Sequence, residues 1–288
     1  MSFAHQTAAC VDIETVPDEE ILPPELPQGE FPPLPCHRVV AISMVVAEIV
    51  RGDNGSEWFR VSGVHSGGRE DFSEAQLLRG FWDWVGRAKP RIVTWNGRKF
   101  DLPVLKYRAA VHALAAGHWH TAGDKWNGYT RRYSPDWHCD LGDVMSDYGA
   151  ARMAGLDLMA KACGFPGKVG GHGSEVAAMV RDGRLDLVRA YCEGDVLNLF
   201  ALYVRWALLS GLSTPAGHNA SMQSLVDVLE RERMSRPHLG DFLDKWRASP
   251  RPAPMLAEEP FAPPADASLD EAGPDGVPEP CMGQPGRR

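Results

Sequence analysis

The sequence predicts an α/β domain built on a mixed β-sheet with helices on its faces. Three consecutive stretches near the N-terminus are rich in β-branched and aromatic residues, which is typical of neighbouring strands. Further along, short apolar stretches alternate with segments of helical periodicity, and this alternation favours a sheet that helices cover. The 288 residues suffice for one large domain with extensions or for about two domains.

Four strands can be assigned from residue type and from the turns between them. The first two are separated by a proline-rich segment from Pro17 to Pro35, which is longer than an ordinary hairpin connection. This length indicates a functional loop or an ordered crossing segment. The predicted strands are Ala8–Val16, Arg38–Val50, Glu57–Val64 and Arg91–Trp95.

Helical periodicity and helix-end signals predict the helices. Ser73 and Gln76 have the spacing of a capping box, which begins a helix that runs toward Ala88. The longest predicted helix begins at Leu185 and ends at Ser210, before a glycine. Other helices are predicted near Leu102–Ala115, Leu156–Cys163 and Ser174–Arg181, with one or two more in residues 219–247.

The predicted domain organisation has three parts. Residues 1–215 form the domain that contains the sheet, and residues 216–249 form a short helical extension. Residues 250–288 are rich in proline and acidic residues. Such a composition cannot bury enough apolar surface to offset its ordering entropy, so we expect a disordered tail that is available to a protein partner.

Composition and charge exclude several classes of protein. No apolar run reaches the ~18 residues of a membrane span, and no secretory signal is visible, so we expect a cytoplasmic protein without a membrane partner. The six cysteines contain no Cys-x-x-Cys pair and indicate reduced thiols. The net charge of −8 argues against a protein that coats nucleic acid, although it permits an enzyme with one neutralised cleft.

Two carboxylates lie on one face of the first predicted strand. Asp12 and Glu14 are separated by one residue, and strand side chains alternate, so both point the same way. At about 4 Å, two like charges repel by roughly 4 kcal/mol at an effective dielectric of 20. A divalent cation offsets this repulsion, and carboxylate oxygens suit Mg²⁺ or Mn²⁺. Taken alone, the pair fits a loop cap beside a solvated acid better than a metal site.

Further acidic residues lie where they can join this pair. Asp101 opens a helix just after a strand and a turn, and Tyr191 and Asp195 lie one helical turn apart. Taken singly, Asp101 is more often a helix N-cap. Tyr191 and Asp195 are more often a buried tyrosine and an exposed acid. Their order along the chain, each on a suitable element, favours one common site.

These segments resemble the motifs of the DEDD superfamily of 3′–5′ exonucleases. A tyrosine four residues before the last aspartate is typical of the DEDDy branch. The chain is most similar to the predicted exonucleases related to the proofreading domain of family B DNA polymerases, from about Cys10 to Gly211. Gly194, inside the third motif, departs from a good helix sequence at a cost of about 1 kcal/mol relative to alanine. The motifs are Asp12-Ile-Glu14-Thr15, Asn96-x-x-x-Phe100-Asp101 and Tyr191-Cys-x-x-Asp195.

The resemblance implies an RNase H-like fold, with a mixed five-stranded sheet flanked by helices, and a phosphodiesterase that uses two Mg²⁺ or Mn²⁺ ions. Asp12 would bridge both ions, and Asp101 would hold the second, partly through water. Glu14 and Asp195 would complete the site that activates water. Tyr191 would orient the nucleophilic water. Two such ions stabilise both the attacking and the leaving oxygen of an in-line displacement.

Other residues are candidates for binding the substrate. The resemblance puts Thr15, Asn96 and Phe100 near the terminal nucleotide, although core packing explains Phe100 equally well. Lys168 lies in a glycine-rich loop that can bring its ammonium group to a phosphate, although it fits an ordinary exposed lysine somewhat better.

Aromatic and basic residues alternate between Trp119 and Trp137. The pattern suits stacking and backbone contact on a single strand, and it suits equally a loop anchored by its own aromatic side chains. Four nearby histidines lack a zinc-site spacing. These histidines are His112, His118, His120 and His138.

The function expected from these observations is a metal-dependent 3′–5′ exonuclease. It would act on 3′ ends of single-stranded nucleic acid, on DNA rather than RNA, and would release nucleoside 5′-monophosphates. One alternative is a catalytically weak nucleic-acid-binding or adaptor module of the same fold. A second is a 3′–5′ exoribonuclease of RNA processing.

Overall fold

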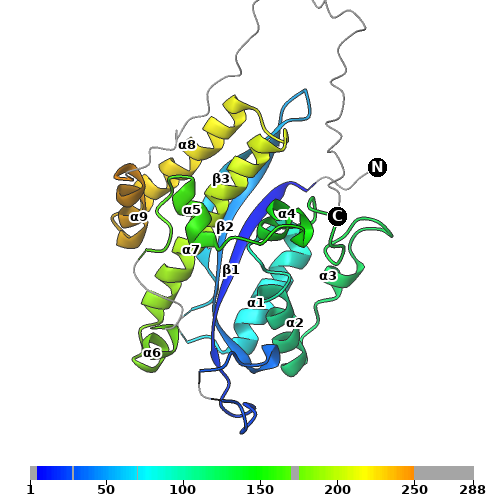
Figure 1. Ribbon diagram of the computed structural model, residues 1–288, viewed down its shortest axis with the longest axis vertical. Helices are drawn as coiled ribbons and strands as arrows, with labels where there is room; N and C mark the ends of the chain where they lie inside the picture. The colour runs from blue at the N-terminus through cyan, green and yellow to red at the C-terminus, as the bar shows by residue number, and fades with distance from the viewer. Residues whose placement is uncertain (1–4, 28, 70, 170–174, 250–288) are drawn as a thin grey trace, which may run out of the picture. The chain divides into compact units, whose positions relative to one another are not determined.

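A five-stranded mixed sheet lies at the centre of the computed structural model, which describes residues 5–27, 29–69, 71–169 and 175–249 (Figure 1). The strand order is β3-β2-β1-β4-β5. β1 pairs antiparallel with β2, as β2 does with β3, whereas β1, β4 and β5 run parallel. The strands are β1 (Thr7–Pro17), β2 (His37–Arg51), β3 (Glu57–Ser66), β4 (Arg91–Thr94) and β5 (His138–Asp140).

This sheet confirms the predicted α/β fold with a mixed five-stranded sheet flanked by helices, and it is consistent with an RNase H-like exonuclease fold. The four strands assigned from residue type lie within two residues of the predicted bounds. β5 was not located from the sequence, because three residues are too short for an alternating pattern to stand out.

Helices and short 3₁₀ turns connect and cover the strands. The capping box predicted at Ser73 is present: its Oγ accepts from the Gln76 N–H at 3.3 Å, and the Gln76 Oε1 accepts from the Ser73 N–H at 2.8 Å. The 3₁₀ turns are η1 (Leu34–Cys36) and η2 (Asp147–Gly149). The helices are α1 (Glu74–Ala88), α2 (Asp101–Val111), α3 (Gly117–Thr121), α4 (Leu141–Met145), α5 (Leu156–Ala162), α6 (Val176–Arg181), α7 (Leu185–Leu209), α8 (Pro215–Glu232) and α9 (Pro237–Arg247).

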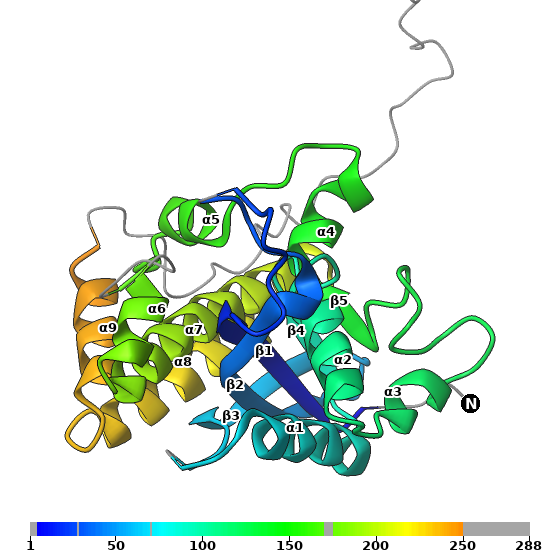
Figure 2. The same cartoon turned by 90° about the horizontal axis from the view of Figure 1, so that it is seen from below.

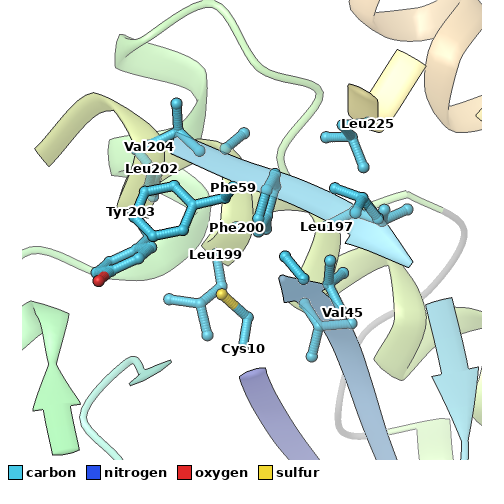
Figure 3. Packing of buried hydrophobic residues seen from close by; sticks show 14 of the residues in the cluster. Cys10, Val45, Phe59, Leu197, Leu199, Phe200, Leu202, Tyr203, Val204 and Leu225 are labelled. Atoms are coloured by element: carbon cyan, nitrogen blue, oxygen red, sulfur yellow. The ribbon is translucent and has the colours of Figure 1, made fainter. Parts of the chain in front are cut away.

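The two faces of the sheet carry different helices. α7, α8 and α9 lie on one face, and α1, α2 and α3 lie on the other (Figure 2). Cys10 of β1 packs with Phe200 of α7 in the first layer (Figure 3), whereas Val11 packs with Phe81 and Leu105 in the second. Because side chains alternate along β1, the even-numbered Asp12 and Glu14 lie on the α7 side of the strand.

α7 runs through the middle of its layer. Every residue from Tyr191 to Val204 is buried, which is typical of a helix that packs on all sides. No helix in the described part of the chain is long and apolar enough to cross a membrane.

α8 and α9, which were predicted as an extension, share the core of the sheet. Leu225 of α8 and Trp246 of α9 belong to the same apolar cluster as α7 (Figure 3 shows Leu225). Ser221 of α8 accepts a hydrogen bond from the Phe59 N–H of β3 at 2.8 Å, so α8 satisfies part of the open edge of the sheet. The predicted disordered tail, 250–288, lies outside the described residues.

A buried ion pair joins the two halves of the sheet. Arg91 of β4 donates to both carboxylate oxygens of Glu57 of β3, at 2.6 and 3.2 Å, and to the Tyr203 hydroxyl of α7 at 3.0 Å. A paired arginine and carboxylate tolerate burial that neither charge would tolerate alone.

Candidate active site

Four carboxylates converge beside the C-terminal half of β1. Asp12 and Glu14 come from β1, Asp101 is the first residue of α2, and Asp195 lies in α7. Asp101 and Asp195 are buried, and the two strand carboxylates are half-buried. The other three carboxylates all raise the pKa of Asp12, so all four lie within electrostatic reach of one another.

Burial is the main cause of high pKa values in this cluster. It raises the pKa of Glu14 to about 8, that of Asp101 to about 7 and that of Asp195 to about 6. The pKa of Asp12 lies well above its usual range, because burial and the neighbouring carboxylates both disfavour its charged form. The cluster therefore needs added positive charge to be fully ionised at neutral pH.

The donor atoms of this cluster fit hard divalent cations. Carboxylate oxygens of Asp12 and Glu14 and the sulfur of Cys192 all lie within 4.8 Å of one another. Burial raises the pKa of the Cys192 thiol strongly, and the thiol donates to the Asp12 Oδ2 at 3.5 Å, so the sulfur is a hydrogen-bond donor and not a thiolate ligand. The remaining donors are oxygens, which Mg²⁺ and Mn²⁺ prefer.

A turn after β4 brings Asp101 to β1. Asp140, at the end of β5, accepts hydrogen bonds from the backbone N–H groups of Asn96 at 2.7 Å and Arg98 at 2.9 Å. Asn96 has a left-handed φ of 61°, and a Cβ at Gly97 would lie 2.5 Å from Thr94. This tight turn starts α2 at Asp101, whose carboxylate accepts a hydrogen bond from the backbone of Ile13.

Tyr191 links Asp195 to Lys168. The Lys168 ammonium donates to the Tyr191 hydroxyl oxygen at 2.7 Å, and the hydroxyl hydrogen-bonds to the Asp195 carboxylate. Burial and the nearby carboxylates raise the pKa of Tyr191, so the phenol stays protonated and acts as a hydrogen-bond donor. The positive charge of Lys168 lowers the pKa of both Glu14 and Asp195.

A buried asparagine holds the loop that carries Lys168. The Asn198 side-chain amide donates to the carbonyls of Gly167 at 2.8 Å and Gly194 at 2.9 Å, and its oxygen accepts from the Gly167 N–H at 3.1 Å. Asp157 accepts from the Lys168 N–H at 2.7 Å. Asn198 was missed from the sequence, although one amide in an apolar helical run is a signal, because a buried amide needs partners.

Three rings cluster around residues that are neighbours in sequence of Glu14 and Asp101. A bulge separates Glu14 from Thr15, and the Thr15 hydroxyl lies 3.0 Å from the Nδ1 of buried His37. The His37 ring meets Phe100 edge-on at 5.0 Å, and Phe31 lies 5.6 Å from Phe100 with 67% of its surface exposed. We call Phe31, His37 and Phe100 the ring cluster. Phe31 was missed because its loop shows no periodic pattern, and His37 because it is the first residue of β2, where nothing local marks its ring.

The aromatic stretch before β5 divides into two groups. Trp119, Tyr129 and Trp137 are buried, and the first two rings stack at 4.6 Å, so these residues anchor the loop. Trp126 and Tyr133 have 74% and 71% of their surfaces exposed. The buried rings fit the interpretation of a loop anchored by its own aromatic side chains, and the exposed rings leave contact with a strand as a prediction.

The histidines near this stretch have separate partners. The His112 Nε2 lies 2.7 Å from Glu74, and the His138 Nε2 lies 2.9 Å from the Thr94 hydroxyl. Burial and nearby basic residues lower the pKa of His138 well below its usual range, so its ring is neutral.

Comparison with models of protein families identifies a family for most of the chain. The model of a family described as a predicted 3′–5′ exonuclease related to the exonuclease domain of PolB matches residues 29–246, most of the chain. Asp101, Lys168 and Asp195 lie within the match, whereas Asp12 and Glu14 precede it on a strand that pairs with β2. No curated protein matches the sequence. With the sheet and the carboxylate cluster described above, this match shows that the chain belongs to the family of predicted 3′–5′ exonucleases related to the exonuclease domain of PolB.

Proposed function

We propose that this protein is a metal-dependent 3′–5′ exonuclease that removes nucleotides from the 3′ end of single-stranded nucleic acid. One observation carries the proposal: four carboxylates with raised pKa values converge beside a tyrosine that a lysine contacts. A module that only binds nucleic acid has no use for such a cluster, because its negative charge repels phosphate.

The residues that would hold two divalent cations, Mg²⁺ or Mn²⁺, are Asp12, Glu14, Asp101 and Asp195. Bound cations of this kind polarise the phosphodiester and lower the pKa of water, which supplies the electrophilic part of the chemistry. Asp12 lies within electrostatic reach of the other three carboxylates, since each of them raises its pKa. We therefore expect Asp12 to be the carboxylate whose loss would disturb the cation site most.

Tyr191 and Lys168 act on the reacting groups directly in this proposal. The Tyr191 hydroxyl, held between Asp195 and Lys168, orients the attacking water. The Lys168 ammonium neutralises an oxygen of the scissile phosphate. The water oxygen bonds to phosphorus and gives up a proton to solvent, while the bond from phosphorus to the 3′-oxygen of the preceding nucleotide breaks and that oxygen takes up a proton from solvent. The products are a nucleoside 5′-monophosphate and a shortened strand with a 3′-hydroxyl.

The terminal nucleotide lies against Thr15, Asn96 and Phe100 in this proposal. Phe100 is half-buried within the ring cluster, so one edge can contact a base while the rest packs on protein. A single strand suits the site, because the terminal phosphodiester must reach carboxylates that are partly or fully buried. We propose DNA as the preferred strand, in line with the family's relation to a polymerase exonuclease domain.

The direct test is an assay on single-stranded DNA and RNA of one sequence, labelled at the 5′ end or the 3′ end, with Mg²⁺ or Mn²⁺. We expect 5′-labelled DNA to shorten stepwise and 3′-labelled DNA to release the labelled mononucleotide at once. Excess chelator should abolish hydrolysis, and an Asp12→Ala variant, which lacks a carboxylate within reach of the other three, should be inactive with either metal.

Each other outcome identifies an alternative. Strand binding without hydrolysis under any metal would indicate a binding or adaptor module. Faster cleavage of RNA than of DNA would indicate an exoribonuclease. Activity that persists in excess chelator would contradict the assignment of the four carboxylates.

A further inference from the structure

A basic groove lies on the outer side of α2. It encloses about 520 Å³ between α2, the turn before it and the 3₁₀ turn η1. Its lining, all within the described residues, contains three cationic side chains and no carboxylate. The lining residues are Leu34, Arg98, Lys99, Pro103, Lys106 and Tyr107.

Within the part of the chain that the structure describes, the side chains of these three cations form no hydrogen bond or ion pair with a carboxylate, although Asp143 lies within electrostatic reach of Arg98 and Lys99. Among the described residues, neither Lys99 nor Lys106 forms an ion pair, and both side chains are exposed. The Arg98 guanidinium donates only to backbone carbonyls, those of Arg131 at 2.8 Å and His138 at 3.3 Å. Partial burial and the charge of Arg98 lower the pKa of Lys106. Positive charges held together in this way are stabilised by an anion.

The basic groove is built from segments that also contribute to the candidate active site. Lys99 directly precedes Phe100 and Asp101, and the turn that carries Arg98 is held by Asp140. η1 packs beside α2 (Figure 2), so the loop that contributes Phe31 to the ring cluster also contributes Leu34 to the groove. Lys106 lies five residues after Asp101, which is about 7.5 Å along the helix axis and roughly 140° around it, so the two side chains leave α2 on different faces. The basic groove therefore adjoins the ring cluster, through the Phe31–Leu34 loop and the Lys99–Phe100 step, and lies on the side of α2 away from the buried Asp101 carboxylate.

We propose that the basic groove binds the phosphodiester backbone of the single strand immediately 5′ of its terminal nucleotide; this inference rests on the proposed exonuclease function. The lysines contact successive phosphates, which positions a strand without reading its sequence. Tyr107, with 48% of its surface exposed, offers a ring on which a base stacks. The groove makes affinity depend on strand length, since a substrate of one nucleotide does not reach it.

The test compares two double variants of equal charge change. Lys99→Glu/Lys106→Glu alters the basic groove, and Arg79→Glu/Lys245→Glu alters exposed residues of α1 and α9. Binding to a 12-nucleotide DNA strand without metal is measured at several salt concentrations. Hydrolysis with Mn²⁺ is measured on that strand and on the p-nitrophenyl ester of thymidine 5′-monophosphate.

We expect the groove variant to bind the strand at least tenfold more weakly than the parent. Its slope of log affinity against log salt should fall by about 1.4, since each lost phosphate contact on a single strand accounts for about 0.7. Its ratio of kcat/KM for the strand to that for the small ester should fall by a similar factor of at least ten, whereas the control variant keeps the parental ratio and slope.

An unchanged salt slope, or an equal loss on the strand and the small ester, would overturn the groove assignment. The assignment would also be overturned if polyglutamate displaced the bound strand as effectively as unlabelled DNA does. That result would point to an acidic protein partner. Failure of the exonuclease proposal looks different: the parent protein then hydrolyses neither substrate, while the binding measurement still reports on the groove.

Discussion

At the scale of single residues, the candidate site depends on carboxylates whose pKa values are raised by burial, which favours their protonated form. Glu14 and Asp195 share the influence of Lys168, and the same lysine contacts the Tyr191 hydroxyl. One ammonium group therefore affects the acids and the phenol together. The catalytic role of the Tyr191 hydroxyl and the ionisation of Glu14 can be tested separately.

The first prediction concerns Tyr191→Phe. The ring and its packing stay, while the hydroxyl that orients water is lost, so the single-turnover rate should fall on the order of 10²-fold. The melting temperature and the metal titration should match the parent. Tyr133→Phe, which removes an exposed hydroxyl, is the control. A parental rate in Tyr191→Phe would mean that this tyrosine serves packing alone.

The second prediction concerns the pH dependence of stability without metal. Folding raises the pKa of Glu14 to about 8, so the folded state binds its proton more tightly than the unfolded state does. The favourable contribution of this carboxyl is present at low pH and is lost as the pH rises from its usual pKa, about 4.3, through 8. The amide of Glu14→Gln stays neutral at all these pH values. As the pH rises from 6 to 8.5, the free energy of unfolding of this variant should therefore increase relative to that of the parent.

The expected gain of Glu14→Gln is at least about 1 kcal/mol, the equivalent of roughly one pKa unit. Urea denaturation of the parent and the variant in chelator, at pH 6 and at pH 8.5, measures this gain. Glu19→Gln, in the exposed part of the proline-rich loop, is the control and should show no such gain. Parallel stability curves for the parent and Glu14→Gln would show that Glu14 ionises normally in the folded protein.

At the scale of elements, each motif has a defined position in a helix or strand: within β1, at the start of α2 and within α7. The turn from Asn96 to Arg98 is held by Asp140, and the Lys168 loop is held by Asn198. Gly194 was expected to weaken α7. The space around it is open, because a Cβ at this position would have no neighbour within 4 Å.

The third prediction follows from that open space. Gly194→Ala should raise the free energy of unfolding by about 0.5–1 kcal/mol, since it restricts the unfolded chain and strains nothing in the helix. Gly97→Ala should instead destabilise the protein, because its Cβ would lie 2.5 Å from Thr94. Chemical denaturation measures both. Destabilisation by Gly194→Ala would indicate that α7 needs the glycine for a close approach.

At the scale of the whole molecule, α8 and α9 complete the layer that covers the α7 side of the sheet. Glu193 of α7 is buried and is held by Ser66 of β3 at 2.6 Å, by His238 of α9 and by Arg236 just before it. The C-terminal helices thus supply charge partners to a residue two positions from Asp195.

The fourth prediction concerns two truncated chains. A chain that ends at Ser249 keeps all the described contacts and should unfold in one transition near the parental temperature. A chain that ends at Ser213 lacks Leu225 and Trp246 from the core and leaves Glu193 without two partners. Since an unpaired buried carboxylate costs about 3–5 kcal/mol, this chain should not form a stable fold. Circular dichroism melts distinguish the two, and a stable, cooperative fold in the shorter chain would make α8 and α9 a true extension.

Local sequence was enough to predict much of the fold and the candidate site. The first three strands and α1 show patterns or caps that extend over several residues, and their bounds agree with the structure. Asp12 and Glu14 share a face because strand side chains alternate, and Tyr191 and Asp195 share one because a helix repeats about every 3.6 residues. These are properties of neighbouring residues, which the chain order alone specifies.

Contacts between distant residues settled what no local pattern shows. β5 forms because a three-residue segment meets β4. His37, at the start of β2, and Phe31, in a loop without periodicity, contact Phe100 only in the folded chain. The basic groove exists because η1 packs against α2. Burial also governs the pKa values of the four carboxylates, and burial arises only when layers far apart in the sequence pack together.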